Sequence, residues 1–168
     1  MTMYALQVLP GYEAEAASLL NQRAVEVAAS VPCSEFEFVS NGVMRDEVRP
    51  MVPGLVLLEA NDDAQARKAC RRARGLGELR VPNTQLEELA PEEAAVVLGL
   101  CGQEHVAAFS EGTFANGQLA VKQGALAGRE SLVGRINHRN KCAYIPVGLG
   151  GSTVELQVGL RVTRKERN

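Results

Sequence analysis

The fold of the C-terminal part of this chain is decided by the stretch Gly117-Gln118-Leu119-Ala120-Val121-Lys122-Gln123-Gly124-Ala125-Leu126-Ala127-Gly128-Arg129-Glu130. Residues 118–121 have the composition of a short strand. Gly124 and Gly128 follow, and glycine adopts the unusual backbone angles of a tight turn without steric cost. The stretch therefore predicts a strand that runs into a tight glycine turn.

Further short strands and turns follow this stretch. They are separated by the polar turn at residues 137–140 and the glycine-rich turn at 148–151. We expect strands at residues 131–136, 143–147, 153–158 and 160–163. Five short strands in about fifty residues are typical of a small β-barrel.

The pattern upstream alternates strands with helices. Asn41-Gly42 is a hairpin signal between two alternating runs, and Pro91-Glu92-Glu93 is a good helix opening. We expect strands at residues 3–9, 35–39, 43–49, 55–58 and 78–81, and helices at 12–29, 62–74 and 91–100. This order predicts an α+β fold in which helices pack on one side of an antiparallel sheet.

Charge is distributed unevenly along the chain. Residues 1–115 hold nine Lys/Arg and seventeen Asp/Glu, a net charge of −8, whereas residues 116–168 hold nine Lys/Arg and three Asp/Glu, a net charge of +6. Such asymmetry indicates two domains with different partners. We predict an N-terminal domain over residues 1–101, a polar linker over 102–115 and a barrel over 116–168.

Composition excludes several classes of protein. No apolar run approaches the roughly 20 residues that cross a bilayer, and the N-terminus lacks the features of a signal peptide, so we expect no membrane contact and a cytoplasmic location. The four cysteines form no CxxC pair, which excludes zinc ribbons and thioredoxin-like motifs. We expect no metal, no cofactor and no catalytic residues. A reactive pair of Cys101 and His105 is the enzymatic alternative.

The sequence resembles the NusG family of transcription factors over nearly its whole length. Residues 117–130 look like a KOW motif, which forms an SH3-like barrel, and Asn137, Lys141, Ala143 and Val147 continue the resemblance. Residues 4–8 followed by Gly11-Tyr12-Glu13 look like the start of the NusG N-terminal (NGN) domain. The segments Pro53-Gly54-Leu55-Val56-Leu57, Gly75-Leu76 and Leu89-Ala90-Pro91-Glu92-Glu93 follow in the family's order.

Several residues depart from the family pattern. Met3 and Leu55 stand where the family usually has an aromatic residue, Ala125 replaces a usual proline, and Ser131 replaces a usual glycine. The closing residues 158–162 also differ from the housekeeping ending. These departures are typical of a specialised paralogue similar to LoaP, which acts at particular operons.

The resemblance implies a polymerase-binding surface on the N-terminal domain. In the family an apolar patch grips the clamp helices of the RNA polymerase beta-prime subunit, and burial of apolar surface suits such a contact. Carried over by position, the patch comprises Tyr4, Gln7, Val52, Pro53, Gly54 and Leu55. The alternative is that these residues form sheet core and a turn.

Two groups of cations are candidates for contact with nucleic acid. The predicted second helix carries Arg67, Lys68, Arg71, Arg72 and Arg74. The barrel carries Lys122, Arg135, His138, Arg139 and Lys141, most of them around one turn. Phosphates of upstream DNA or nascent RNA would suit both groups. A solvated helix face is the alternative for the first group. A protein partner, such as a ribosomal protein or termination factor, is the alternative for the second.

These features together predict a non-enzymatic, monomeric factor that binds RNA polymerase and regulates transcription elongation, termination or antitermination. The other possibility is a KOW-type RNA-binding or ribosome-associated protein that does not bind polymerase.

Overall fold

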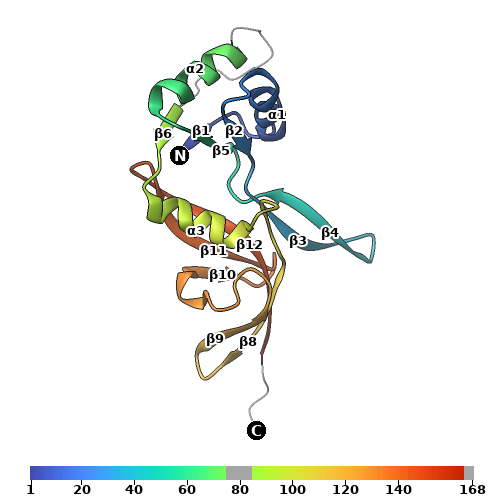
Figure 1. Ribbon diagram of the computed structural model, residues 1–168. Coiled ribbons are helices and arrows are strands. Elements are labelled where there is room, and N and C mark those ends of the chain that lie inside the picture. The colour runs from blue at the N-terminus through green and yellow to red at the C-terminus, as the bar shows by residue number, and fades with distance from the viewer. Residues whose placement is uncertain (75–84, 165–168) are drawn as a thin grey trace.

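The computed structural model describes residues 1–74 and 85–164, so the strand predicted at residues 78–81 lies outside the described part (Figure 1). The described part contains helices α1 (Glu13–Arg23), α2 (Asp63–Arg74) and α3 (Pro91–Cys101), together with one 3-10 helix, Glu130–Leu132. Its strands form three sheets. The predicted α+β class is confirmed.

The first sheet has the order β2-β5-β1-β6, from β2 (Ala28–Ser30), β5 (Leu55–Ala60), β1 (Thr2–Gln7) and β6 (Gln85–Glu88). All its neighbouring strands are antiparallel. Helices α1 and α2 cover one face, where Tyr4 and Leu6 of β1 join a buried cluster. Alternation along β1 sends Met3 and Ala5 to the other face.

Buried alanines in α2 and N-terminal capping of α3 explain why these segments form helices. In α2 the residues Ala66, Ala69 and Ala73 are fully buried at three- and four-residue spacing, so the polar residues between them face solvent. Helix α3 begins at Pro91, and the carboxylate of Glu93 accepts a hydrogen bond of 2.9 Å from the N–H of Ala90. Proline removes one backbone N–H that would have no partner in the first turn, and the Glu93 carboxylate accepts a hydrogen bond from another.

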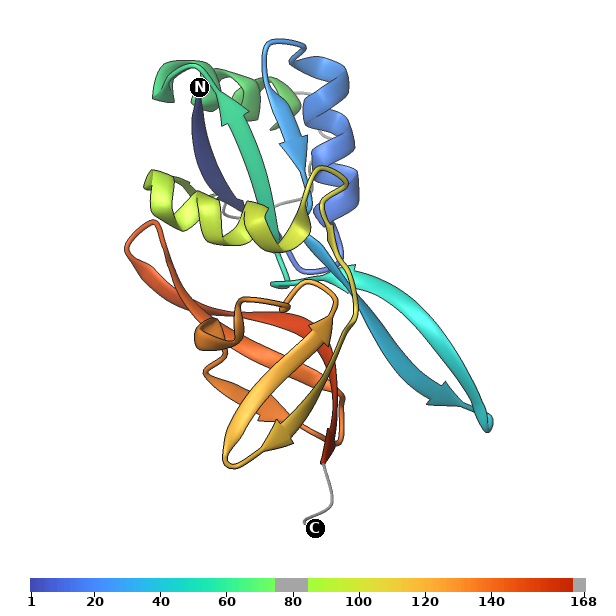
Figure 2. The same cartoon turned by 60° about the horizontal axis from the view of Figure 1, so that its bottom comes forward.

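A long hairpin projects from the body of the molecule (Figures 1 and 2). It consists of β3 (Cys33–Ser40) and β4 (Val43–Pro50), and the short strand β7 (Val106–Ala107) pairs with the first two residues of β3. Asn41 and Gly42 both have positive φ, as the predicted two-residue hairpin turn requires.

The C-terminal sheet has five strands in the order β10-β11-β12-β8-β9. The strands are β8 (Ser110–Ala115), β9 (Gln118–Gln123), β10 (Arg135–Asn137), β11 (Cys142–Leu149) and β12 (Ser152–Arg164). The first part of β12 pairs with β11 and the last part with β8. Gly124 has φ +99°, and a side chain there would overlap the backbone of Phe109 and Ser110.

Several sequence predictions need correction. The strand predicted at residues 131–136 is instead the 3-10 helix Glu130–Leu132 followed by the short strand β10. The first helix ends at Arg23 instead of residue 29, and β2 follows it. The strands predicted at 153–158 and 160–163 are one strand, β12, because Gly159 continues the extended backbone. Residues 85–88, for which no strand was predicted, form β6. Residues 102–115, predicted as a linker, hold β7 and β8. The two residues of β7 are too few for a strand signal, and the mostly polar sequence of β8 gave none, although β8 lies between two partners.

One hydrophobic cluster joins the two parts of the chain. Leu55 and Leu57 of the first sheet share it with Val97 of α3 and with Ile145 and Leu149 of β11. Helix α3 lies between the first sheet and the C-terminal sheet (Figure 2). The second face of the first sheet is therefore covered partly by α3 and partly by the C-terminal half, so the prediction that the helices pack on one side of the sheet is wrong for α3.

Candidate functional site

The turn before β5 is the first candidate surface, and local hydrogen bonds hold it. Gly54 has φ +85°, and a Cβ atom there would lie 2.5 Å from the carbonyl oxygen of Val8. The carbonyl of Gly54 accepts from the N–H of Val8 at 2.7 Å. The buried carboxylate of Glu13 accepts from the N–H groups of Gly11 and Gly54 at 2.5 and 3.3 Å. Close approach and left-handed backbone both require glycine at position 54.

Five of the six residues predicted for polymerase binding lie together. They line one cavity of about 100 Å³, and they are Gln7, Val52, Pro53, Gly54 and Leu55. Gln7 and Pro53 are exposed, whereas Leu55 is only 7% exposed. Leu149, Ser152 and Val154 of the β11–β12 hairpin line the same cavity. The C-terminal half therefore lies against the predicted patch.

Tyr4 does not join this group. It is 2% exposed and lies in the cluster beneath α1 and α2. Burial raises the pKa of its hydroxyl above the ordinary value. Because side chains alternate along β1, Tyr4 points to the opposite face from Gln7, and its position fits the alternative reading as sheet core.

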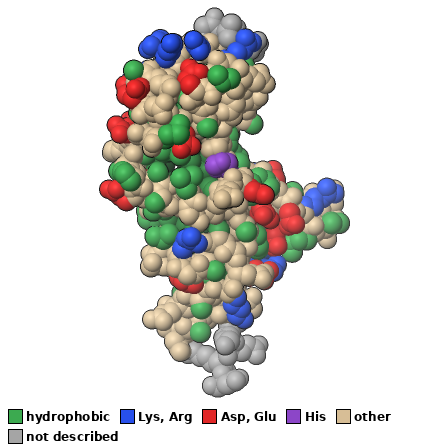
Figure 3. Space-filling view, in the orientation of Figure 1, with side chains coloured by type: hydrophobic (Ala, Val, Ile, Leu, Met, Phe, Trp, Pro, Cys, Tyr) green, Lys and Arg blue, Asp and Glu red, His purple; other side chains and the backbone are tan. Residues whose placement is uncertain are grey.

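The cations of α2 lie on the exposed side of that helix, where Lys and Arg side chains gather at one end of the molecule (Figure 3). Arg67 pairs with Asp63 at 2.8 Å, and Arg72 pairs with Glu26 at 3.4 Å. Lys68 and Arg71 have no ion-pair partner within residues 1–74 and 85–164. The side chain of Arg74 is outside the described part of the chain.

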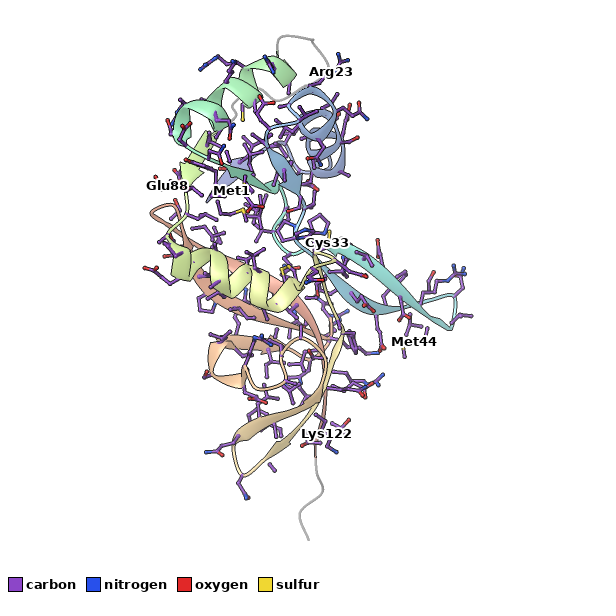
Figure 4. All side chains as sticks on the ribbon, viewed as in Figure 1. Met1, Arg23, Cys33, Met44, Glu88 and Lys122 are labelled. Atoms are coloured by element: carbon purple, nitrogen blue, oxygen red, sulfur yellow. The ribbon has the colours of Figure 1, made fainter. Side chains whose placement is uncertain are left out.

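The cations of the C-terminal half do not form one group. His138, Arg139 and Lys141 lie on the turn between β10 and β11, whereas Lys122 lies on β9 at the other end of the strand order. Figure 4 labels Lys122 at the lower end of the C-terminal half and Met44 on the β3–β4 hairpin. Arg135 is held by the carboxylate of Glu155, at 3.1 and 3.3 Å, and its guanidinium lies 3.7 Å from the centre of the Tyr144 ring. The ion pair raises the pKa of Arg135.

A groove that the sequence analysis missed lies between the β3–β4 hairpin and the turn at residues 137–141. It has a volume of about 460 Å³, and Phe38, Arg49, Arg139 and Lys141 are among its lining residues. In the sequence, only the basic turn indicated a binding site here. The sequence did not show that the hairpin lies beside this turn, because that contact depends on long-range packing.

The enzymatic alternative finds no support in the geometry of Cys101. Its thiol is buried, and desolvation raises the pKa to about 12, which leaves almost no nucleophilic thiolate near neutral pH. Its sulfur lies 3.6 Å from the sulfur of Met51. Within the described residues, no group of three or more His, Cys, Asp or Glu side chains could hold a metal ion.

Comparison with known families identifies the chain. The family model described as transcription termination factor NusG matches residues 1–96, more than half of the sequence. The chain belongs to the NusG family. NusG proteins are non-enzymatic factors that act in transcription elongation and termination, so this chain is a transcription factor of that family. Among the described helices, none is long and apolar enough to cross a membrane.

Solved structures of low sequence identity also match this NusG-family chain. A structure titled "Domain interaction in Thermotoga maritima NusG" is 15% identical, with a TM-score of 0.48, and the match covers 95% of this chain and 93% of that one. The MjSpt4:Spt5 complex in conformation B gives 14% identity, a TM-score of 0.36, and coverage of 94% and 91%. No curated protein matches the sequence.

Proposed function

We propose that this NusG-family protein binds RNA polymerase and regulates elongation, termination or antitermination. The observation that carries the proposal is the clustering of Gln7, Val52, Pro53, Gly54 and Leu55 around one cavity. Residues from β1 and from the turn before β5 meet there because these two strands pair directly. Pro53 is exposed and Val52 is half-buried beside it, and apolar side chains at the rim of a cavity suit a protein contact. The partner would be the clamp helices of the beta-prime subunit.

The C-terminal half limits access to this surface in the described arrangement. Leu55 is buried in the cluster that also contains Leu149 of β11. Polymerase could reach Gln7 and Pro53 directly, but a contact with Leu55 requires the β11–β12 hairpin to move away. That movement would have to occur between β7, which pairs with β3, and β8, which pairs with β12 and β9. We propose that the part of the chain from β8 onward is a KOW barrel that can separate from the N-terminal domain.

Nucleic acid is the second proposed partner. The unpaired ammonium and guanidinium groups of Lys68 and Arg71 face solvent on α2, where upstream DNA or nascent RNA phosphates could bind. We further propose that the protein is a monomeric, cytoplasmic, operon-specific paralogue similar to LoaP. The departures at Met3, Ala125 and Ser131 support this specialisation.

A second candidate function is RNA or ribosome binding without polymerase. The turn that carries His138, Arg139 and Lys141 favours it, because Arg139 and Lys141 line a groove that is distinct from the cavity at Pro53. A ribosomal protein or termination factor could occupy the same turn.

A transcription assay separates these candidates. RNA polymerase from the same organism is halted on its own operon leader and then released, with and without the full-length chain. We expect a changed distribution of paused and terminated transcripts, together with co-elution of the chain with polymerase. Unchanged transcripts and no co-elution, combined with binding to leader RNA alone, would favour the second candidate.

A further inference from the structure

The free edge of strand β3 borders the groove between the hairpin and the C-terminal half. Four consecutive residues of β3, Phe36–Val39, line this groove. Consecutive side chains of a strand point to opposite faces, so four in a row can line a groove only where the strand's edge faces it. Gly159 of β12 packs against the carbonyl of Glu35, but beyond that point no described strand pairs with β3 on that edge.

The hairpin turn determines which backbone groups point into the groove. A two-residue turn at Asn41-Gly42 makes Ser40 and Val43 a hydrogen-bonded pair, so the bonded pairs continue at Phe38 and Phe36. Glu37 and Val39 then direct their N–H and C=O groups away from β4. The bond from the N–H of Cys33 to His105, on the β7 side, agrees with this alternation. None of the described residues bonds to the backbone of Glu37 or Val39 on that edge.

The rest of the groove is cationic, with an aromatic and amide floor. Arg139 and Lys141 form the opposite wall and have no carboxylate partner in the described chain, although the ammonium of Lys141 lies 3.9 Å from the sulfur of Met44 on β4. The carboxylate of Glu37, which also lines the groove, is bound by Arg161 at 3.0 Å. Tyr144 and Gln157 are cross-strand partners and lie on the floor. Unpaired backbone groups beside unpaired cations suit an extended polypeptide with acidic side chains.

We propose that this groove binds an extended acidic segment of a partner protein, which adds to the free edge of β3 as an extra strand. Backbone bonds to Glu37 and Val39 would supply the pairing. Arg139 and Lys141 would bind carboxylates of the segment, and Phe38, which is 37% exposed, would contact its apolar residues. The favoured ligand alternates acidic and apolar residues, as an exposed strand does. This site is separate from the proposed polymerase surface.

Peptide binding to the full-length chain tests the proposal. The probe is a fluorescent seven-residue peptide of alternating glutamate and valine, and its affinity is measured by anisotropy. Two derivatives carry N-methyl groups on all glutamate amides or on all valine amides. Only one set of amides faces β3 in an added strand, so we expect one derivative to lose at least tenfold in affinity while the other binds normally. Equal effects of the two methylations, or no binding of the parent peptide, would overturn the proposal.

Protein variants test the same site independently. Val39→Pro removes an N–H that faces the groove but none that bonds to β4, so we expect at least tenfold weaker binding, with Val39→Ala close to the parent. Charge reversal by Arg139→Glu with Lys141→Glu should abolish binding, whereas Lys122→Glu should leave it intact. A ten-nucleotide uridine RNA is the competitor. If that RNA binds the groove and the peptide does not displace it, the ligand is nucleic acid and the proposal is wrong.

Discussion

Arg161 of β12 and Glu37 of β3 form an ion pair of 3.0 Å that joins the C-terminal sheet to the projecting hairpin. The same guanidinium also contacts the carboxylate of Glu111 on β8 and lies 5.9 Å from the centre of the Phe109 ring. Strand β12 contributes a second bond nearby, from the N–H of Gly159 to the hydroxyl of Ser34 at 3.2 Å. The hairpin is thus held against the C-terminal half by side-chain bonds as well as by apolar packing.

The Arg161–Glu37 pair should contribute measurably to stability. Because Glu37 is mostly buried and Arg161 partly exposed, we expect a coupling energy of about 0.5–1 kcal/mol in a double-mutant cycle with Arg161→Met and Glu37→Gln. Urea unfolding of the four proteins measures it. The exposed pair of Arg67 and Asp63 serves as the control and should give less than half that coupling. Additive effects of the two substitutions at positions 37 and 161 would show that the pair does not contribute to stability.

Gly159 should be required for the close approach of β12 to β3. A side chain there would overlap the backbone oxygen of Glu35 and crowd the Phe109 ring. We expect Gly159→Ala to lower the free energy of unfolding by about 1–3 kcal/mol, because backbone atoms must move. Gly148→Ala is the matched control in a strand, since its added methyl meets no backbone and only the carboxylate end of the Glu93 side chain, at 3.1 Å. Similar unfolding curves for the two variants would contradict this packing.

Cys101 should make stability fall at alkaline pH. Its pKa is raised to about 12 by burial, so the folded state holds the proton more tightly than the unfolded chain, whose thiol titrates near 9. The stabilisation is complete below pH 9 and is lost as the pH rises toward 12. We therefore expect the stability advantage of the parent over Cys101→Ala to shrink between pH 9 and 12. A pH-independent difference in urea midpoint would argue against this burial.

Nucleic-acid binding by α2 should depend on its unpaired cations. Replacing Lys68 and Arg71 with Ala should weaken binding to duplex DNA and reduce the salt dependence by about one to two phosphate contacts. Arg67→Ala is the control, because that side chain is already paired with Asp63. Titrations at several salt concentrations measure both quantities. If the salt dependence of DNA affinity is unchanged in the double variant, this helix face is only exposed to solvent and does not bind phosphates.

Local patterns predicted much of this fold, and long-range packing explains the rest. The Asn41-Gly42 turn and the start of α3 at Pro91 were readable because their signals lie within a few residues. Strand β8 was not, since its polar sequence is stabilised by pairing with β12, about fifty residues away. Similarly, the alternation of β1 could indicate that Tyr4 and Gln7 face opposite ways but not which face the helices cover. Because α1 and α2 cover the face that carries Tyr4, Tyr4 lies in the core, and Gln7 lies at the predicted surface.

Binding of RNA polymerase core enzyme to variants at Pro53 measures the proposed contact most directly. Pro53 is exposed at the turn, so Pro53→Asp places a charge in the patch without disturbing the core. Val25→Asp is the matched control at an apolar residue that is 88% exposed and does not line the cavity. We predict at least tenfold weaker binding for Pro53→Asp, about 1.4 kcal/mol, and parental affinity for Val25→Asp. Parental affinity for Pro53→Asp would contradict polymerase binding at this surface.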